Sequence, residues 1–111
     1  MATTREEARA KPRIIAGVTR AIARALNLIH DDPKAAVDAV LASGLARAER
    51  PQLEAIVAIY GRAVPRTPKI SLLGIERDAA LYPAHPRAPD FRQTKAADYV
   101  AAEFAQAATN P

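Results

Sequence analysis

The sequence predicts an all-α fold, a small bundle of about five helices, and three observations support this prediction. Alanine occupies 27 of the 111 positions, and alanine favours helices and is depleted in strands. Proline stands at the expected first helical position of three segments, at Pro12, Pro33 and Pro51, where it is favoured. Apolar residues then follow each proline at helical spacing. A β-sandwich, a β-barrel or a parallel-sheet nucleotide fold is therefore disfavoured.

Chain length and composition predict one helical domain over residues 1–111 with a thin core. Leu, Ile, Val and Phe together number 24, about 22% of the chain, which is close to the roughly 20% below which chains tend to be disordered. Alanine buries little area, so the helices must pack closely to exclude water. We expect the alanines to lie where helices touch.

The composition also excludes several classes of site. The chain has no cysteine, so a disulfide framework, a thiolate zinc site and a thiol nucleophile are excluded. No apolar run approaches the roughly 18 residues of a membrane span, and the first residues lack the apolar segment of a secretory signal. Both cytoplasmic and periplasmic proteins tolerate zero cysteines, so the compartment stays open. We expect a cytoplasmic protein if the chain is native as it stands, and a periplasmic one if it is a fragment of a secreted protein.

The segment from Pro12 to His30 is predicted to be an amphipathic surface helix. On a wheel of about 100° per residue, its apolar face comprises Ile15, Val18, Ile22, Ala25, Leu26 and Ile29. Its opposite face carries Arg13, Arg20 and Arg24, which we expect to lie in water. Asp32 is then a natural N-cap, and Pro33 begins the second helix.

The second predicted helix spans 33–42 and the third begins at Arg50–Pro51. The second buries Ala36, Val37, Val40 and Leu41. It ends at Ser43–Gly44, with the glycine in the position that follows the last helical residues. The third helix has apolar residues at helical spacing, namely Leu53, Ile56, Val57, Tyr60 and Val64. Pro65 ends it.

A Pro-rich crossing over 65–90 is predicted to connect the third helix to the last one. A short helix at 75–81 interrupts it, and residues 69–73 are too few to distinguish a brief strand from other structure. Three prolines recur here with the period of polyproline II, at 83, 86 and 89. A PxxP ligand is one interpretation of this stretch, and a surface crossing between helices is the favoured one.

The two ends of the chain are predicted to be helical as well. The last helix runs from about Thr94 to Ala108 and turns Tyr99, Val100 and Phe104 inward. At the other end, Thr4 and Glu7 have the spacing of a capping box for a short N-terminal turn.

Positive charge is concentrated in the first 24 residues, which hold six of the 16 basic residues and two of the 12 acidic ones. A basic helix can bind nucleic acid or anionic lipid. The chain has only three tyrosines and two phenylalanines, and they do not interleave with the arginines as stacking platforms would. We therefore expect a solvated basic face, and nucleic acid is not a predicted partner.

The best ligand-capable cluster is His30–Asp31–Asp32, with His85 as a distant partner. A metal or acid–base site is one interpretation. The favoured one is structural, with a histidine at a helix C-terminus followed by an N-cap aspartate.

Catalytic and nucleotide-binding motifs are not evident. Ser43 or Ser71 can be combined with His85 and Asp90, but neither serine lies in a nucleophile-elbow pattern. Glu76 and Asp78 are two residues apart and do not share a helix face. The four glycines form no phosphate-binding loop. We predict a protein that is not an enzyme, with no catalytic, cofactor-binding or metal-binding residue, no cofactor, and ligand-binding residues unknown.

One stretch resembles a known family. Lys11-Pro12-Arg13-Ile14-Ile15 through Ala21-Ile22-Ala23-Arg24-Ala25-Leu26, and then Asp31-Asp32-Pro33-Lys34-Ala35-Ala36-Val37, resembles the helical part of the substrate-binding proteins of bacterial ABC importers. The type it is similar to is the nitrate, sulfonate, taurine and thiamine-precursor type. The likeness extends over 11–108 and is sharpest over 11–41. Gly74-Ile75-Glu76-Arg77-Asp78 is similar to a weakened later turn of that family.

The resemblance implies a helical module of a periplasmic binding protein for small anions, with an ABC importer or the rest of that protein as its partner. This sequence has about a third of the family's usual length and lacks the N-terminal strands that form the ligand cleft, so no binding residue is carried over. The competing hypothesis is a small cytoplasmic helical interaction protein, a dimer that covers its thin core with its partner.

Overall fold

The computed structural model describes residues 2–81 and 95–109, and it confirms the all-α prediction. Helices and the coil between them account for all of the described chain, which contains no strand. The α-helices are α1 (Arg5–Ala10), α2 (Pro12–Asp31), α3 (Pro33–Ala42), α4 (Arg50–Tyr60), α5 (Leu72–Leu81) and α6 (Ala102–Thr109). Two short 3-10 helices, η1 (Gly61–Ala63) and η3 (Ala96–Tyr99), complete the described elements.

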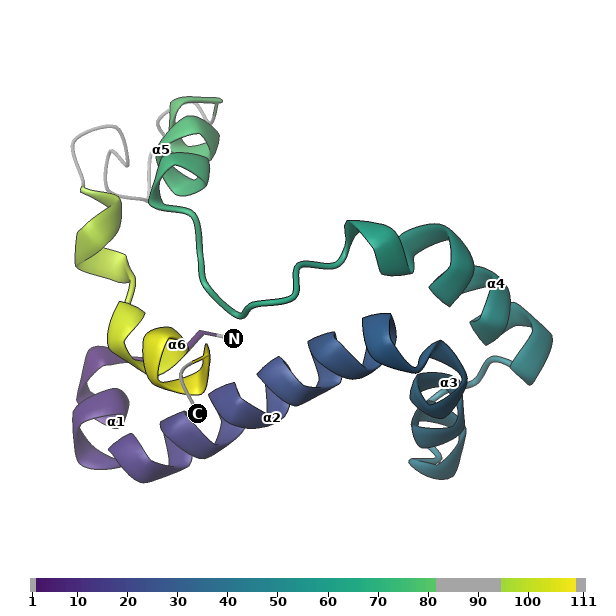
Figure 1. Ribbon diagram of the computed structural model, residues 1–111. Helices are drawn as coiled ribbons and strands as arrows, with labels where there is room; N and C mark the ends of the chain where they lie inside the picture. The colour runs from purple at the N-terminus through teal and green to yellow at the C-terminus, as the bar shows by residue number, and fades with distance from the viewer. Residues whose placement is uncertain (1, 82–94, 110–111) are drawn as a thin grey trace.

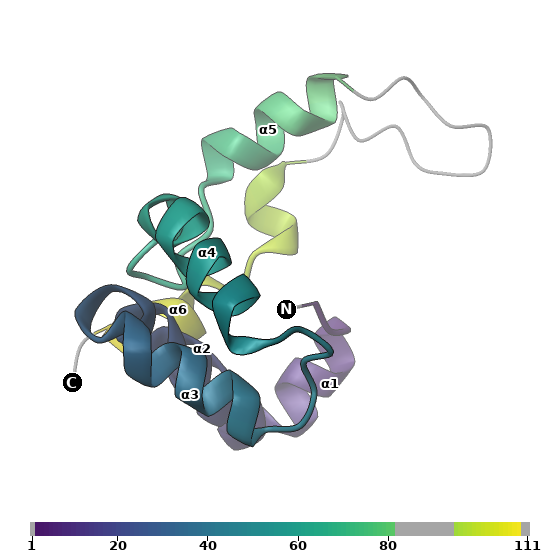
Figure 2. The same cartoon turned by 90° about the vertical axis from the view of Figure 1, so that its right-hand side faces the viewer.

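Helix α2 is the spine of the molecule, as Figure 1 shows. Helices α3 and α4 pack at its C-terminal end, whereas α1 and α6 lie against its N-terminal half. An extended segment leaves α4 and leads to α5, which stands apart from the spine and packs on η3 (Figures 1 and 2). The N-terminal helix α1 and the C-terminal helix α6 therefore meet on α2. Helices α3 and α4 form one projection at the C-terminal end of α2, and α5 forms another.

The buried stripe of α2 differs from the predicted one. The buried residues are Ile15, Thr19 and Ala23, spaced four apart, whereas Val18 is 41% exposed and Ala25 is exposed. The hydroxyl of Thr19 donates to the carbonyl oxygen of Ile15 at 2.8 Å, so this buried polar group is satisfied inside the helix. The three arginines of the opposite face are exposed, as predicted.

Helix α3 begins and ends at the predicted residues. The Asp32 carboxylate accepts a hydrogen bond from the backbone N–H of Ala35 at 2.9 Å, which is the N-cap arrangement. At the other end, Gly44 has φ of 66°, a left-handed conformation that costs side-chain-bearing residues energy. Val37 is the most buried large side chain, at 2% exposure, but the predicted Val40 is 42% exposed.

Helix α4 ends earlier than predicted, and only one of its apolar stripes faces the molecule. Its last turn tightens into η1, and Val64 is extended beyond it. Leu53 and Val57 are half-buried, but Ile56 and Tyr60 are 48% and 63% exposed. The helical spacing of these residues is therefore present, but they are not all buried, because the neighbouring elements cover only one edge of this face of the helix.

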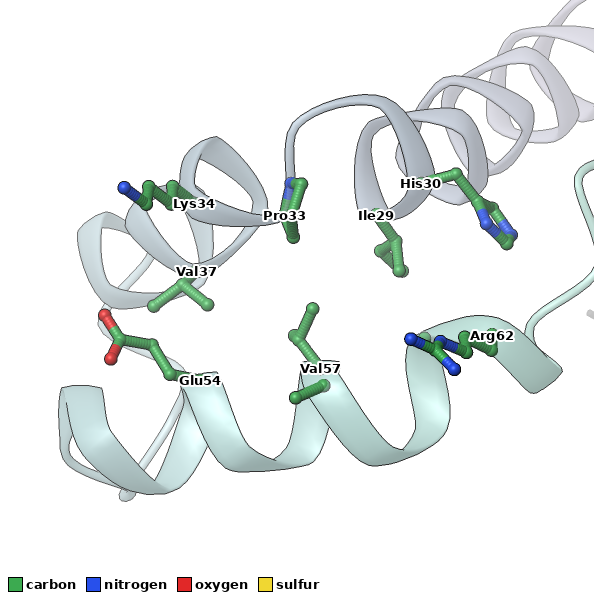
Figure 3. A pocket seen from close by; sticks show the side chains of 10 residues that line it. Ile29, His30, Pro33, Lys34, Val37, Glu54, Val57 and Arg62 are labelled. Atoms are coloured by element: carbon green, nitrogen blue, oxygen red, sulfur yellow. The ribbon is translucent and has the colours of Figure 1, made fainter.

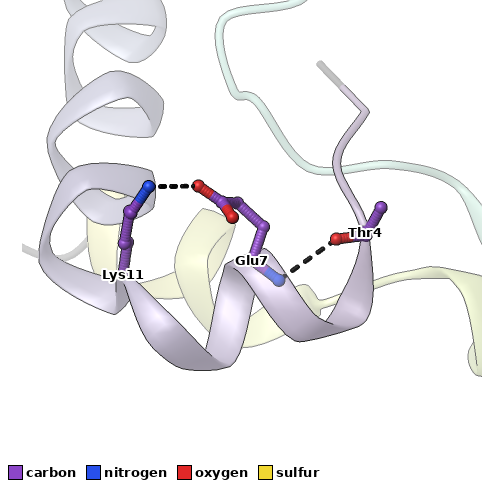
Figure 4. A network of polar contacts seen from close by, with 3 residues as sticks. All are labelled: Thr4, Glu7 and Lys11. Atoms are coloured by element: carbon purple, nitrogen blue, oxygen red, sulfur yellow. Dashed lines mark hydrogen bonds and ion pairs between the residues drawn. The ribbon is translucent and has the colours of Figure 1, made fainter.

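The predicted N-terminal turn is a full helix, α1. The hydroxyl of Thr4 accepts a hydrogen bond from the backbone N–H of Glu7 at 3.1 Å, as an N-cap does. The Glu7 carboxylate forms an ion pair with Lys11 at 2.7 Å, as Figure 4 shows. Half of the predicted capping box is thus present.

Helix α5 is longer than predicted and replaces the C-terminal part of the candidate strand. It begins at Leu72, and the preceding residues 69–71 are coil. The Ser71 hydroxyl accepts from the backbone N–H of Gly74 at 3.1 Å, so the serine caps this helix and ends the extended segment. The polyproline stretch at 83–89 lies outside the described residues.

The last predicted helix is two pieces. Residues 96–99 form η3, Val100 is extended, and α6 begins at Ala102. Tyr99 is 61% exposed rather than inward, whereas Val100 and Phe104 are half-buried. The break lets η3 pack on α5 while α6 packs on α2, which one straight helix over these residues cannot do.

The core is as thin as the composition predicted. The buried apolar residues of the described chain are Ile15, Ala23, Ala36, Val37 and Ala96. Three of these five are alanines, so close contact between helices supplies much of the burial. Within this part of the chain, none of the helices combines the length and hydropathy needed to span a bilayer.

Candidate functional site

The His30–Asp31–Asp32 cluster has structural partners for each side chain. His30 Nε2 lies 2.7 Å from the carbonyl oxygen of Val64, and Asp31 forms an ion pair with Arg66 at 2.7 Å. Asp32 caps α3. His30 and Asp31 thereby hold the segment that follows η1 against the end of α2. This is the structural interpretation that the sequence favoured, and the partners across 34 and 35 residues are an addition to it.

The two candidate serines also have local partners. Ser43 Oγ donates to a backbone carbonyl of α3 at 2.7 Å, and Ser71 accepts from the first turn of α5. His85 and Asp90 lie outside the described residues. Among residues 2–81 and 95–109, no three His, Asp or Glu side chains gather closely enough to hold a metal ion.

A groove lies between the C-terminal end of α2, α3 and α4, with a cavity volume of about 540 Å³. Its lining is Ile29, His30, Pro33, Lys34, Val37, Glu54, Val57, Ala58, Gly61 and Arg62. Figure 3 shows Ile29 and Pro33 on one side and Val57 on the other, directed toward the space between the helices. The floor of the groove is thus apolar.

Charged side chains stand at both ends of the groove. His30 and Arg62 lie at one end, and Lys34 and Glu54 lie at the other (Figure 3). An ion pair between Arg50 Nη2 and Asp38 Oδ1, at 2.7 Å, ties α4 to α3 beside it. An apolar group can bind in this groove with a polar group at either rim.

Gly61 sets the distance between α4 and α2 at the groove. It is buried, and a Cβ at this position would lie 3.4 Å from Ile29 Cγ2 and 3.7 Å from Val57 Cγ1. The absence of a side chain lets the end of α4 approach α2 closely. No sequence pattern predicted this groove, although a glycine directly after the apolar spacing of α4 was a signal for close approach.

The outward side of α4 is a second candidate site. Ile59 and Tyr60 are 68% and 63% exposed, and Ile56 beside them is nearly half exposed. In Figure 1 α4 lies at the outer edge of the molecule, and Figure 2 shows it facing the viewer with no helix in front. A group of large apolar side chains that the described part of the fold leaves exposed is typical of an interaction surface.

Comparisons with protein-family models, with curated proteins and with solved structures find no match to this chain. The interpretation of function therefore depends on the geometry and on the residues themselves.

Proposed function

We propose that this chain is a non-enzymatic helical module that works by packing its exposed apolar faces against another protein. The observation that carries the proposal is the exposure of large apolar side chains on α4 and α5. Ile59 is 68% exposed, Leu73 is 55% exposed and Leu81 is 79% exposed, whereas only five apolar residues of the described chain are buried. Single exposed apolar residues are ordinary, but this many beside so small a core favour a role in association.

The resemblance of residues 11–41 supports one form of this function. In this form the chain is the helical part of an ABC-importer substrate-binding protein for nitrate, sulfonate or taurine-like anions, and the partner is the cleft-forming remainder. We then expect calorimetry on the 111-residue chain to show no binding of taurine, nitrate or an alkanesulfonate, because the strands that form the cleft are not among these residues. Micromolar binding would contradict this form.

The second form is a small interaction protein that associates with itself. The exposed side chains on the outward side of α4, Ile56, Ile59 and Tyr60, favour this form. They are uncharged, and an ion pair to α3 holds their helix in place. No cleft is needed for this form.

Thermal unfolding at increasing chain concentration, followed by circular dichroism, tests the shared proposal. We expect the melting temperature to rise with concentration if the apolar faces meet in an oligomer. If the apolar faces bind a different protein instead, we expect this chain to be a monomer that binds an apolar fluorescent dye. A melting temperature independent of concentration, together with no dye binding, would show that the fold needs no partner.

A further inference from the structure

We propose that a second copy of this chain covers the outward side of α4, which makes the protein a homodimer through this helix. This inference depends on the proposed function and names its partner. The surface concerned is the outer stripe of α4, which comprises Gln52, Ile56 and Ile59 with Tyr60 beside them.

Helix α4 has two apolar stripes, and the elements within residues 2–81 and 95–109 cover only one of them. The inner stripe, Leu53 and Val57, is half-buried where α4 packs on α3, and the buried Gly61 of η1 continues it against α2. The outer stripe lies roughly 120° around the helix from the inner one, as the helical repeat of 3.6 residues requires. All of its residues are exposed. A surface helix of a complete globular fold has one apolar stripe, and the other side is polar.

The spacing of the outer stripe is that of a helix–helix seam. Its members, at 52, 56 and 59, follow one another by four and three residues. This is the alternation of the two apolar positions in a coiled-coil heptad, which places each side chain between residues of a facing helix. Isoleucine occupies two of the three positions. The occupant that this pattern fits is another helix.

A second copy fits the stripe because two copies meet without charge repulsion. A two-fold interface brings the same patch of both chains together, so a charged stripe would face its own charge. Here every member of the stripe is uncharged. The charged side chains of the helix, Arg50 and Glu54, lie on its other side, where Arg50 pairs with Glu54 at 3.8 Å and with Asp38. The outer stripe of α4 is therefore free of these charges.

Rigidity of the helix also favours this surface. The capping box of Glu49 and Gln52 fixes the start of α4, and the Arg50–Asp38 ion pair holds this helix against α3. A preorganised surface loses little conformational entropy on association. A seam on one helix of about three turns is at the small end of specific interfaces, so we expect micromolar association.

Sedimentation equilibrium of the 111-residue chain tests this inference, with concentrations that span a roughly hundredfold range. The unaltered chain should show twice the monomer mass of 11.9 kDa at the upper end. Ile59→Glu should weaken the dimer by about 100-fold, because each dimer loses two apolar contacts and would bury two carboxylates. Ile56→Gln should weaken it less, by about tenfold.

Ile14→Glu is the matched control. Ile14 is 59% exposed but lies on α2, away from the stripe, so this variant should dimerise as the unaltered chain does. Circular dichroism checks that all three variants keep their helix content. A dimer that Ile59→Glu leaves unchanged would overturn the inference.

A monomer at every concentration would also overturn it, and dye binding then separates the two proposals. If the monomer binds an apolar dye and Ile59→Glu abolishes that binding, the stripe is an interaction surface for a different protein and the proposed function stands. If the monomer binds no dye, both the second copy and the proposed function fail.

Discussion

The corner formed by α2, α3 and α4 differs sharply from the projection formed by α5. Several independent interactions hold the corner together, including the Asp32 cap, the Arg50–Asp38 ion pair and the contact of His30 with Val64. Helix α5 packs chiefly on η3, and none of its residues is buried. The corner can therefore present a fixed surface to a partner, whereas α5, within the described residues, packs mainly on one short element. The groove and the outward side of α4 both belong to the corner, so the more rigid region carries these two candidate sites.

Truncating one side chain in each region tests the difference between the corner and α5 most strongly. Val37→Ala should lower the free energy of unfolding by about 2 kcal/mol, because it removes two methyl groups from the most buried large side chain and leaves a cavity. Leu81→Ala in α5 should change it by less than about 0.5 kcal/mol, since Leu81 is largely exposed. Urea unfolding followed by circular dichroism measures both. Equal losses would show that α5 is part of the same cooperative core.

Backbone conformation gives the next largest effect. Gly44→Ala should destabilise the chain by about 1–2 kcal/mol, because Gly44 ends the corner helix α3 at φ of 66°. Gly17→Ala is the opposite case. Gly17 lies inside α2, and a Cβ at this position would have no neighbouring atom within 4 Å, so alanine should stabilise by about 0.5–1 kcal/mol. Thermal unfolding measures both, and destabilisation by both substitutions would contradict the helical interior of α2 at Gly17.

The N-cap of α3 contributes a similar but smaller amount. Asp32→Ala should cost about 1 kcal/mol, because the backbone N–H of Ala35 loses its acceptor. Asp31→Asn keeps the size of the neighbouring side chain and leaves that cap in place, which makes it the matched control. We expect the two variants to differ in the midpoint of urea unfolding, with Asp32→Ala the lower. If their midpoints coincide, the cap does not secure the corner.

Local signals in the sequence were sufficient to predict where the helices of the corner begin. Pro12, Pro33 and Pro51 mark helix starts through backbone geometry that depends on few neighbours, and Asp32 and Gly44 act on the helix ends beside them. For the starts of these helices, propensity and proline position agree. The helix boundaries follow from residues that are adjacent in the chain.

The remaining features depend on tertiary contacts that no local pattern contains. Thr19 is buried on a helix that packs on α6, and its hydroxyl is satisfied inside α2. Val100 is extended because η3 and α6 pack on different helices. Spacing alone placed Ile56 and Tyr60 of α4 with the core residues, whereas the fold covers only one side of that helix. The groove likewise requires α2 and α4 to meet, and therefore could not be predicted from either segment.

The smallest expected effect concerns the exposed ion pair that ties the segment after η1 to α2. Arg66→Ala should lower stability by less than about 0.5 kcal/mol, since both partners are more than half exposed and water screens their attraction. The effect should shrink further as salt is added. His30→Ala should cost more, about 1 kcal/mol, because it removes the partly buried contact with the Val64 carbonyl. Unfolding in low and high salt separates the two. If Arg66→Ala is the costlier change, the surface ion pair rather than the histidine holds this segment on the corner, and α5 owes its position to a charge pair that salt can weaken.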